Sequence, residues 1–325
     1  MSNADQTQKG LSQGAVNYGD PEFALFLRKA FIKGAGLSDS DLSKPLVGVI
    51  NTGSDFNPCH GNSPQLIDAV KRGVLMQGAL PVVFPTISLH ESFAAPTSLY
   101  LRNLMSMDTE EMIKAQPMDA VVLIGGCDKT IPAQVMGALS ANKPFVVLPT
   151  GPMLSSRWRG ERVGACTDCR RLWADFRAGR MNQAKIDEAN NYLVPSVGTC
   201  SVMGTASTMA CLVEVMGLTT PNAASAPAVS ADRIRIAERS GYAAARLAKG
   251  EVTMPDFGKE QVLNALTILL AIGGSTNALV HLAAIMGRVG LSLEPNLFNS
   301  IADQVKTDAI NKLSGFGSRH SRIPN

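Results

Sequence analysis

Short apolar runs alternate with amphipathic stretches along the first half of the chain. Four runs consist almost entirely of apolar and often β-branched residues, and they cover 46–51, 81–85, 120–124 and 145–148. Runs of this kind are typical of parallel strands that are covered on both faces. Stretches with a helical period lie around these runs, at 21–33, 63–76, 97–107, 131–139 and 168–178. This alternation predicts an α/β fold in which helices flank a parallel sheet.

The second half of the chain is predicted to be mostly helical. Helical periodicity covers 183–192, 204–216, 231–248, 259–272 and 276–286. The most apolar stretch, 264–286, carries no acidic residue, lysine or arginine, but Gly273 and Gly274 interrupt it, followed by Ser275 and Thr276. Glycines followed by capping residues indicate two short helices rather than a membrane span.

One α/β domain at 21–297 is therefore expected between two polar ends. Residues 1–20 are polar and rich in glycine, which indicates an N-terminal arm. Residues 298–325 form an increasingly polar tail without a core pattern. We see no internal repeat between these ends.

Composition and charge narrow the class of protein. The chain has 325 residues, 45% of them hydrophobic, which is enough to bury a sizeable core. The formal net charge is +3 and no basic run dominates, which argues against binding to nucleic acid. The polar N-terminus does not resemble a secretory signal, so we expect a cytoplasmic protein that does not bind a membrane. In that compartment the six cysteines are expected to be reduced, and they favour a metal or cluster over disulfides.

Unusual polar residues follow the predicted strands, where parallel sheets bind their ligands. Such loops lie at 51–61, 88–92, 125–130 and 150–153, and a later segment of the same character lies at 195–204. Three of these five loops carry a cysteine, namely Cys59, Cys127 and Cys200. The first two loops also carry His60 and His90.

Cys59, Cys127 and Cys200 are the candidate metal ligands. A single cysteine is more often a small buried hydrophobe than a ligand. The joint placement of the three beside glycines, which let the backbone approach a bulky group, strengthens the ligand hypothesis. Three thiolates suit either a zinc site or an iron–sulfur cluster. In a [2Fe–2S] cluster they would leave one iron open, as a Lewis acid for a substrate hydroxyl.

Glu91, Asp128 and Lys129 form a second candidate group. Two carboxylates and a lysine most simply form a partly buried salt bridge. The functional alternative is a hard oxygen site for Mg²⁺ that keeps positions open for substrate. A carbamylated lysine would add carboxylate-like oxygens to such a site.

Other cysteines and histidines are weaker candidates. Cys166 and Cys169 form a Cys-x-x-Cys pattern, which is known from redox and zinc sites. Because no second pair accompanies it, a structural or substrate-adjacent role is favoured. Cys211 and His281 lie on apolar helical stretches and are predicted to be core residues.

Several separated motifs together resemble one enzyme family. They are the segment 125–130 (Gly-Gly-Cys-Asp-Lys-Thr), Gly-Pro-Met at 151–153, Gly-Thr-Cys at 198–200 and Gly-Gly-Ser-Thr-Asn at 273–277. Over about 20–295 the chain resembles the family of dihydroxy-acid dehydratase, 6-phosphogluconate dehydratase and the pentonate dehydratases. His-Glu-Ser-Phe at 90–93 and the segment 164–171 look like the sugar-acid branch, which includes L-arabinonate dehydratase.

This resemblance implies a hydro-lyase. It implies that Cys59, Cys127 and Cys200 hold a [2Fe–2S] cluster. It also implies that Glu91, Asp128 and a carbamylated Lys129 hold Mg²⁺. The implied substrate is a small sugar acid, an aldonate such as L-arabinonate, which loses water to give a 2-keto-3-deoxy acid. A homo-oligomer is also expected.

The family's members are longer and carry a β-rich C-terminal domain with a serine that acts as the base. The present chain ends at Asn325, so the resemblance implies an N-terminal part that is inactive alone and contains no identified base. Three alternatives stay open at this point. They are a dehydratase of another aldonate or of a dihydroxy acid, an inactive cluster-binding remnant, and a zinc-binding α/β protein that uses Cys166 and Cys169.

Overall fold

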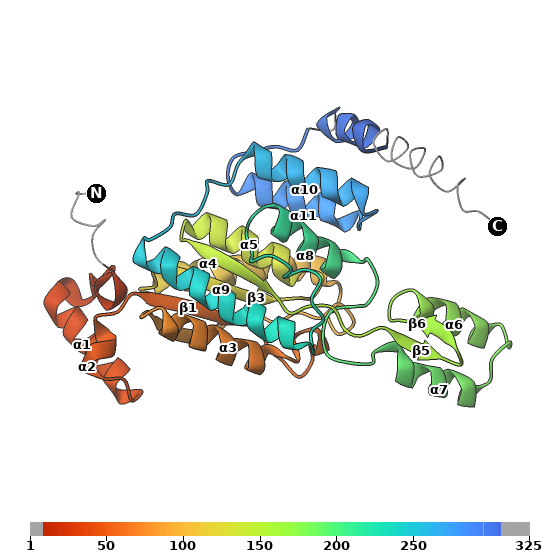
Figure 1. The fold of residues 1–325 in the computed structure, drawn as a ribbon, viewed down its shortest axis with the longest axis horizontal. Helices are drawn as coiled ribbons and strands as arrows, with labels where there is room; N and C mark the ends of the chain where they lie inside the picture. Colours follow the sequence, from red (N-terminus) through yellow and green to blue (C-terminus); the bar gives the residue numbers. More distant parts are fainter. Residues whose placement is uncertain (1–8, 295, 307–325) are drawn as a thin grey trace, which may run out of the picture.

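Four parallel strands form the centre of the molecule (Figure 1). The computed structural model describes residues 9–294 and 296–306. The strands lie in the order β2-β1-β3-β4 and comprise β1 (Leu46–Asn51), β2 (Leu80–Pro85), β3 (Ala120–Gly125) and β4 (Phe145–Pro149). The predicted parallel sheet is thus confirmed, and each strand lies within a residue or so of the predicted range.

Helices cover both faces of the sheet, as predicted (Figure 1). Successive residues of a strand point to opposite faces, so Val121 and Leu123 enter one core while Val122 and Ile124 enter the other. On the face of Val122 lie α3 (Ser63–Met76) and α9 (Ala231–Lys249). The opposite face carries α4 (Ser98–Ala115), α5 (Thr130–Ala141), α8 (Thr205–Val215), α10 (Lys259–Ala271) and α11 (Asn277–Gly287).

Helices α3 and α9 approach each other through two glycines. A β-carbon on Gly73 would lie 2.0 Å from the carbonyl oxygen of Glu238. One on Gly241 would lie 2.2 Å from the carbonyl oxygen of Val70. Because neither backbone can move without displacing a helix, this crossing requires residues that lack a side chain.

A small lobe projects from the sheet domain (right in Figure 1). It contains the antiparallel pair β5 (Ser156–Trp158) and β6 (Glu161–Val163) with α6 (Asp168–Arg177) and α7 (Gln183–Leu193). A separate apolar cluster, which includes Trp158, Leu172 and Ile186, holds these elements together. The hairpin was not predicted, because three-residue strands show no periodicity. Its turn has Arg159 and Gly160 at φ 51° and 86°, the backbone that tight hairpins prefer.

The described residues of both predicted ends contact the sheet domain. In the predicted arm 1–20, Leu11 is buried and the Gly10 amide donates to Asp119 Oδ2 at 2.9 Å. The arm contains two 3₁₀ segments, η1 (Gly10–Ser12) and η2 (Asn17–Gly19), and helices α1 (Pro21–Gly34) and α2 (Asp39–Leu42) follow it. In the predicted tail 298–325, Ile301 is buried against the core, a contact that the polar pattern did not indicate. Residues 307–325 lie outside the described residues.

None of the helices within the described ranges is long and apolar enough to cross a membrane.

The close crossing of α3 and α9 gives a stability prediction. Replacing Gly241 with Ala should lower the free energy of unfolding by about 3 kcal/mol, since the added methyl overlaps the Val70 carbonyl. Gly287→Ala is the matched control, because Gly287 ends a helix and a β-carbon on it would have no neighbour within 4 Å. The control should stay within about 1 kcal/mol of wild type. Urea unfolding of both variants measures this, and equal midpoints would contradict the packing argument.

Candidate functional site

The loops that follow the parallel strands gather at one edge of the sheet. From β1 the chain crosses to β2 on one side, whereas β3 leads to β4 on the other side. The order of strands therefore reverses between the adjacent strands β1 and β3, which is where open α/β sheets bind ligands. Cys59 follows β1 and Cys127 follows β3. The fold thus places these two cysteine loops on either side of the switch point.

A buried histidine joins the two loops. His60 is 1% exposed, and its Nδ1–H donates to the Thr52 carbonyl at 2.8 Å. Its Nε2 accepts from the backbone amides of Gly126 at 2.8 Å and Cys127 at 3.0 Å. Burial lowers the pKa of His60 to about 4, so the ring is neutral and Nε2 is free to accept. One side chain therefore positions the backbone that carries Cys127.

The loop after β4 is fastened to the same place. The Thr150 hydroxyl donates to the Cys59 carbonyl at 2.7 Å. A β-carbon on Gly126 would lie 1.9 Å from that hydroxyl oxygen, so only glycine permits this approach. Farther along, Pro152 and Thr199 form a parallel bridge, which holds the Cys200 loop beside the loop after β4.

Cys59 and Cys127 are close neighbours. The ligand atoms of Cys59, Cys127 and His90 all lie within 4.8 Å of one another, and both cysteines are buried. The interaction between the two thiols lowers the pKa of Cys127 and raises that of Cys59. A thiol must lose its proton before it can bind a metal ion.

Cys200 lies near this pair and contacts a further thiol. Its charge contributes to the raised pKa of Cys59, so the two are close in space. The Sγ atoms of Cys200 and Cys166 are 3.5 Å apart. This contact raises the pKa of Cys200 and lowers that of Cys166 to about 7. The predicted ligands Cys59, Cys127 and Cys200 thus occupy one region, while their role as ligands stays a prediction.

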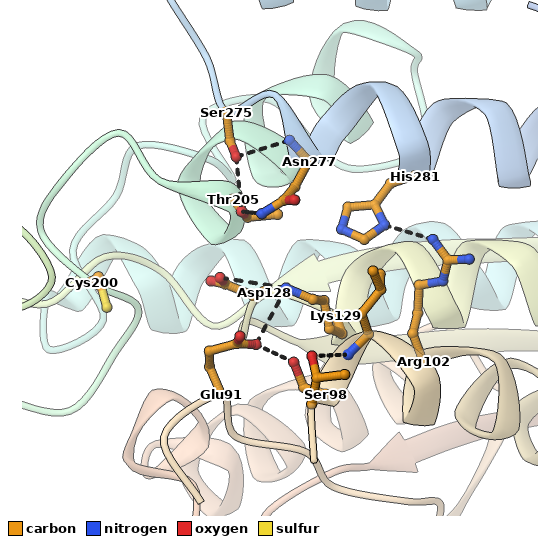
Figure 2. A network of polar contacts seen from close by, with 12 residues as sticks. Glu91, Ser98, Arg102, Asp128, Lys129, Cys200, Thr205, Ser275, Asn277 and His281 are labelled. Atoms are coloured by element: carbon orange, nitrogen blue, oxygen red, sulfur yellow. Dashed lines mark hydrogen bonds and ion pairs between the residues drawn. The ribbon is translucent and has the colours of Figure 1, made fainter. Parts of the chain in front are cut away.

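Glu91, Asp128 and Lys129 also face one another (Figure 2). The Lys129 Nζ atom lies 3.3 Å from Glu91 Oε2 and 3.8 Å from Asp128 Oδ2, and the lysine side chain is only 5% exposed. Ser98 donates from its hydroxyl to Glu91 Oε2. Burial raises the pKa of Asp128 although the Lys129 charge opposes the shift. Lys129 is buried, whereas the side chains of Glu91 and Asp128 are 48% and 28% exposed, so the ion pairs lie where the core meets solvent.

The acidic group and the thiols belong to one site. The charge on Asp128 raises the pKa values of Cys59 and Cys200. The Glu91 backbone provides a hydrogen bond that helps to lower the pKa of Cys127. Soft sulfur donors and hard oxygen donors therefore meet at the carboxyl edge of the sheet.

His281 was predicted to be a core histidine, and it is buried, but it also takes part in a polar network. Arg102 Nη1 donates to its Nδ1 atom at 2.9 Å, and burial lowers the pKa of His281 to about 3. The neutral ring therefore carries its proton on Nε2, which has no partner among the described residues. Figure 2 shows this ring above Lys129, whose charge also lowers the pKa of His281. Sequence reasoning missed the network because Arg102 lies on a different helix, far away along the chain.

Thr205, Ser275 and Asn277 join helices α8 and α11 at the same edge (Figure 2). The hydroxyls of Thr205 and Ser275 are 2.9 Å apart, and Asn277 Nδ2 donates to Thr205 Oγ1 at 3.2 Å. The Ser275 hydroxyl oxygen also accepts from the Asn277 amide at 3.3 Å, at the start of α11, whose N-cap is Thr276.

A comparison with known proteins identifies the family of the chain. Residues 44–316 match the family model described as dihydroxy-acid/6-phosphogluconate dehydratase N-terminal. The chain belongs to this family. The resemblance inferred from the separated motifs is therefore confirmed.

The chain is also similar to curated relatives whose names give different substrates. The chain is 41% identical to L-arabonate dehydratase of Azospirillum brasilense, over 83% of this chain and 46% of that protein. It is 38% identical to 6-deoxy-6-sulfo-D-gluconate dehydratase of Pseudomonas putida, over 78% of this chain and 44% of the relative. It is 33% identical to dihydroxy-acid dehydratase of Clostridium botulinum, with coverage of 90% and 54%. The chain spans about half the length of the curated relatives it matches.

The His60 bridge gives a second stability prediction. His60→Ala removes the acceptor of two buried amides, so we expect a loss of about 2 to 4 kcal/mol in the free energy of unfolding. His90→Ala is the control, because His90 is half-buried and accepts one hydrogen bond, from the exposed Ser92 amide. Its cost should be below about 1 kcal/mol. Urea unfolding of the metal-free protein measures both, and equal losses would show that the bridge contributes nothing specific.

Proposed function

We propose that this chain provides the metal-binding half of a hydro-lyase that dehydrates a sugar acid. The substrate would be an aldonate such as L-arabinonate, and the product a 2-keto-3-deoxy acid. The observation that carries the proposal is the meeting of the thiols of Cys59 and Cys127 with the carboxylate group around Lys129. Membership of the dehydratase family supports it.

The thiol donors fit a [2Fe–2S] cluster. Cys59, Cys127 and Cys200 come from three separate loops, and the charges of Cys127 and Cys200 help to raise the pKa of Cys59. Gly126 leaves the backbone open beside them. Sulfur donors of this kind select iron–sulfur clusters or zinc. The accompanying carboxylates favour the cluster, because a hydroxy acid needs one metal for its leaving oxygen and another for its carboxylate.

The oxygen donors fit Mg²⁺ once Lys129 is modified. As an ammonium, Lys129 repels a cation, whereas its carbamate would supply anionic oxygens beside Glu91 and Asp128. The His281 Nε2–H has no acceptor among the described residues and lies in the neighbourhood of Lys129. A buried donor without an acceptor costs about 1 to 3 kcal/mol. An oxygen added to Lys129 is the kind of acceptor that such a donor requires.

The proposed chemistry divides into binding and proton transfer. When bound, the two metal centres would polarise the substrate's carboxylate and hydroxyl groups and stabilise the negative charge of the enolate. The chain's own part is to fix these donors on rigid strand ends and to keep Lys129 away from water. We assign no catalytic base among residues 9–294 and 296–306. Because the relatives are about twice as long, we expect turnover to need the residues that they carry beyond the match.

The sugar-acid assignment is preferred over a branched dihydroxy acid. Identity is 41% to the L-arabonate dehydratase and 33% to the dihydroxy-acid dehydratase. A cytoplasmic location and a homo-oligomeric state remain predictions.

The visible absorption of Cys→Ser variants tests which cysteines hold the cluster. After anaerobic reconstitution with iron and sulfide, Ser in place of Cys59, Cys127 or Cys200 should abolish the brown absorption and most of the bound iron. Cys211→Ser should leave both unchanged, because Cys211 lies on α8 and is affected by burial and Glu214 rather than by the other thiols. Tight binding of zinc in place of iron would sink the proposal in favour of a zinc protein.

Activity tests the reaction. The reconstituted 325-residue protein, alone and mixed with the C-terminal half of the L-arabonate dehydratase relative, is offered aldonates and a branched dihydroxy acid. We expect 2-keto acid from an aldonate in the mixture, and background rates from the chain alone. Asp128→Asn should lower this turnover by about 100-fold or more, since it removes a charge from the metal site. Asp68→Asn, an exposed acid on α3, should have no effect. Turnover of the dihydroxy acid only would reject the sugar-acid assignment.

A further inference from the structure

His281 and Arg102 form a hydrogen-bonded pair close to Lys129, and the proposed ligand sets use neither residue. His281 lies on α11 and is 0% exposed, while the half-buried Arg102 lies on α4. Both helices pack against α5, which begins directly after Lys129. In Figure 2 the His281 ring lies above Lys129, and Glu91 lies below it. The histidine and the acid thus approach the lysine from different sides.

Arg102 fixes the position of the proton on the His281 ring. A guanidinium group has only donors, so the contact of 2.9 Å between Arg102 Nη1 and His281 Nδ1 requires that Nδ1 accept. Burial, together with the charges of Arg102 and Lys129, lowers the pKa of His281 to about 3, so the ring is neutral. Its single proton is therefore on Nε2, and His281 presents a donor that carries no charge.

This Nε2–H donor has no acceptor among the described residues. Buried polar groups are nearly always hydrogen-bonded, because a group that has lost its hydration needs a partner in the protein. Lys129 is close enough for its charge to act on the ring, but an ammonium group offers donors only. A carbamate on the same nitrogen would offer anionic oxygens instead. Only the modified form of Lys129 can therefore accept from His281.

We propose that His281 is the positioning residue for a carbamate on Lys129, that its Nε2–H donates to one carbamate oxygen, and that Arg102 holds the ring in the required tautomer. The inference rests on the proposed function, in which the carbamate binds Mg²⁺. Carbon dioxide is the co-reactant. After Lys129 Nζ has lost one proton, its electron pair forms a bond to the carbon, and the electron pair of one C–O π bond moves to oxygen. The nitrogen then releases a second proton, and nothing is oxidised or reduced.

A neutral donor suits this position better than a second cation would. Carbamylation replaces a cation beside Glu91 and Asp128 with an anion, so the product needs stabilisation that the free lysine does not. His281 gains its hydrogen bond only in the modified protein, so all of the gain favours the carbamate. Because the donor is uncharged, it does not repel Mg²⁺, and the second carbamate oxygen is left free to bind the metal with the two acids.

Carbon-13 NMR of the reconstituted 325-residue protein tests the proposal. The protein is titrated with ¹³C-labelled carbon dioxide in the presence of Mg²⁺, and we expect one carbamate signal that Lys129→Arg lacks. His281→Phe keeps the ring size but removes the donor. It should raise the carbon dioxide concentration for half-modification by about tenfold or more, as the loss of a hydrogen bond to a charged acceptor implies. His281→Gln, which retains an N–H donor, should recover most of this loss.

Two further variants separate positioning from packing. Leu282→Ala, on the same helix and also fully buried, should lower the free energy of unfolding but leave the titration unchanged. Arg102→Met should shift the titration in the same direction as His281→Phe, though less, because the ring can then adopt either tautomer. It also decides the question if His281→Phe does not fold.

The outcomes distinguish this inference from the proposed function. A wild-type carbamate signal with the same carbon dioxide dependence in the His281 and Arg102 variants would overturn the inference and leave the proposed function standing. An equal shift in Leu282→Ala would also overturn it, since packing alone would then explain the effect. Absence of any carbamate signal from the wild type would overturn the proposed Mg²⁺ site, and this inference with it.

Discussion

The neutral imidazole of His60 is the interaction on which the site depends. It spans the switch point of the sheet, donating to the loop after β1 and accepting from two amides of the loop after β3. A charged ring could not accept at Nε2, so the burial that lowers its pKa is part of its function. Without this bridge, each cysteine loop would have unpaired backbone groups inside the protein. The relative positions of Cys59 and Cys127 follow from it.

Burial also sets the electrostatics of the oxygen donors. Lys129 is almost fully buried, and its nearest opposite charges are the carboxylates of Glu91 and Asp128. The position of Lys129 just before α5 keeps it at the strand end while the helix continues into the core. Burying a cation costs free energy unless its partners compensate, and here the compensation comes from groups that can themselves bind a metal. The two acids therefore balance the charge of a lysine that has little contact with water.

Sequence periodicity predicted the sheet well because buried parallel strands have an unmistakable apolar signature. Strand β1 and helix α3 have the boundaries that the pattern indicated. The site loops were also predictable, since loops after parallel strands must share one edge. By contrast, the hairpin β5–β6 is too short for a periodic signal. Helix α4 runs to Ala115, beyond the predicted 107. Its last turns mix the charged residues Glu110, Glu111 and Lys114 with Met112 and Ile113, which pack on the core, and the charges obscure the helical period.

Long-range pairings were the part that local patterns could not give. The Arg102–His281 contact joins helices that lie far apart in sequence, and nothing in either helix indicates the other. The contact of Cys166 with Cys200 was hidden for the same reason. The Cys-x-x-Cys spacing had left open a zinc site that uses Cys166 and Cys169 together. In the fold, helix α6 turns Cys169 into the apolar cluster of the lobe instead.

The sheet domain and the lobe are packed around separate apolar cores. The apolar clusters of the sheet domain enclose both faces of the strands, so the loops with Cys59 and Cys127 start from a rigid base. The lobe buries its own smaller cluster and reaches the site through the loop that carries Cys166. A small core confers less resistance to local opening than a large one. Cys200 lies between the two units, after α7 and before α8, where it is held by the backbone bridge of Thr199 to Pro152. This bridge ties the Cys200 loop to the loop that follows β4.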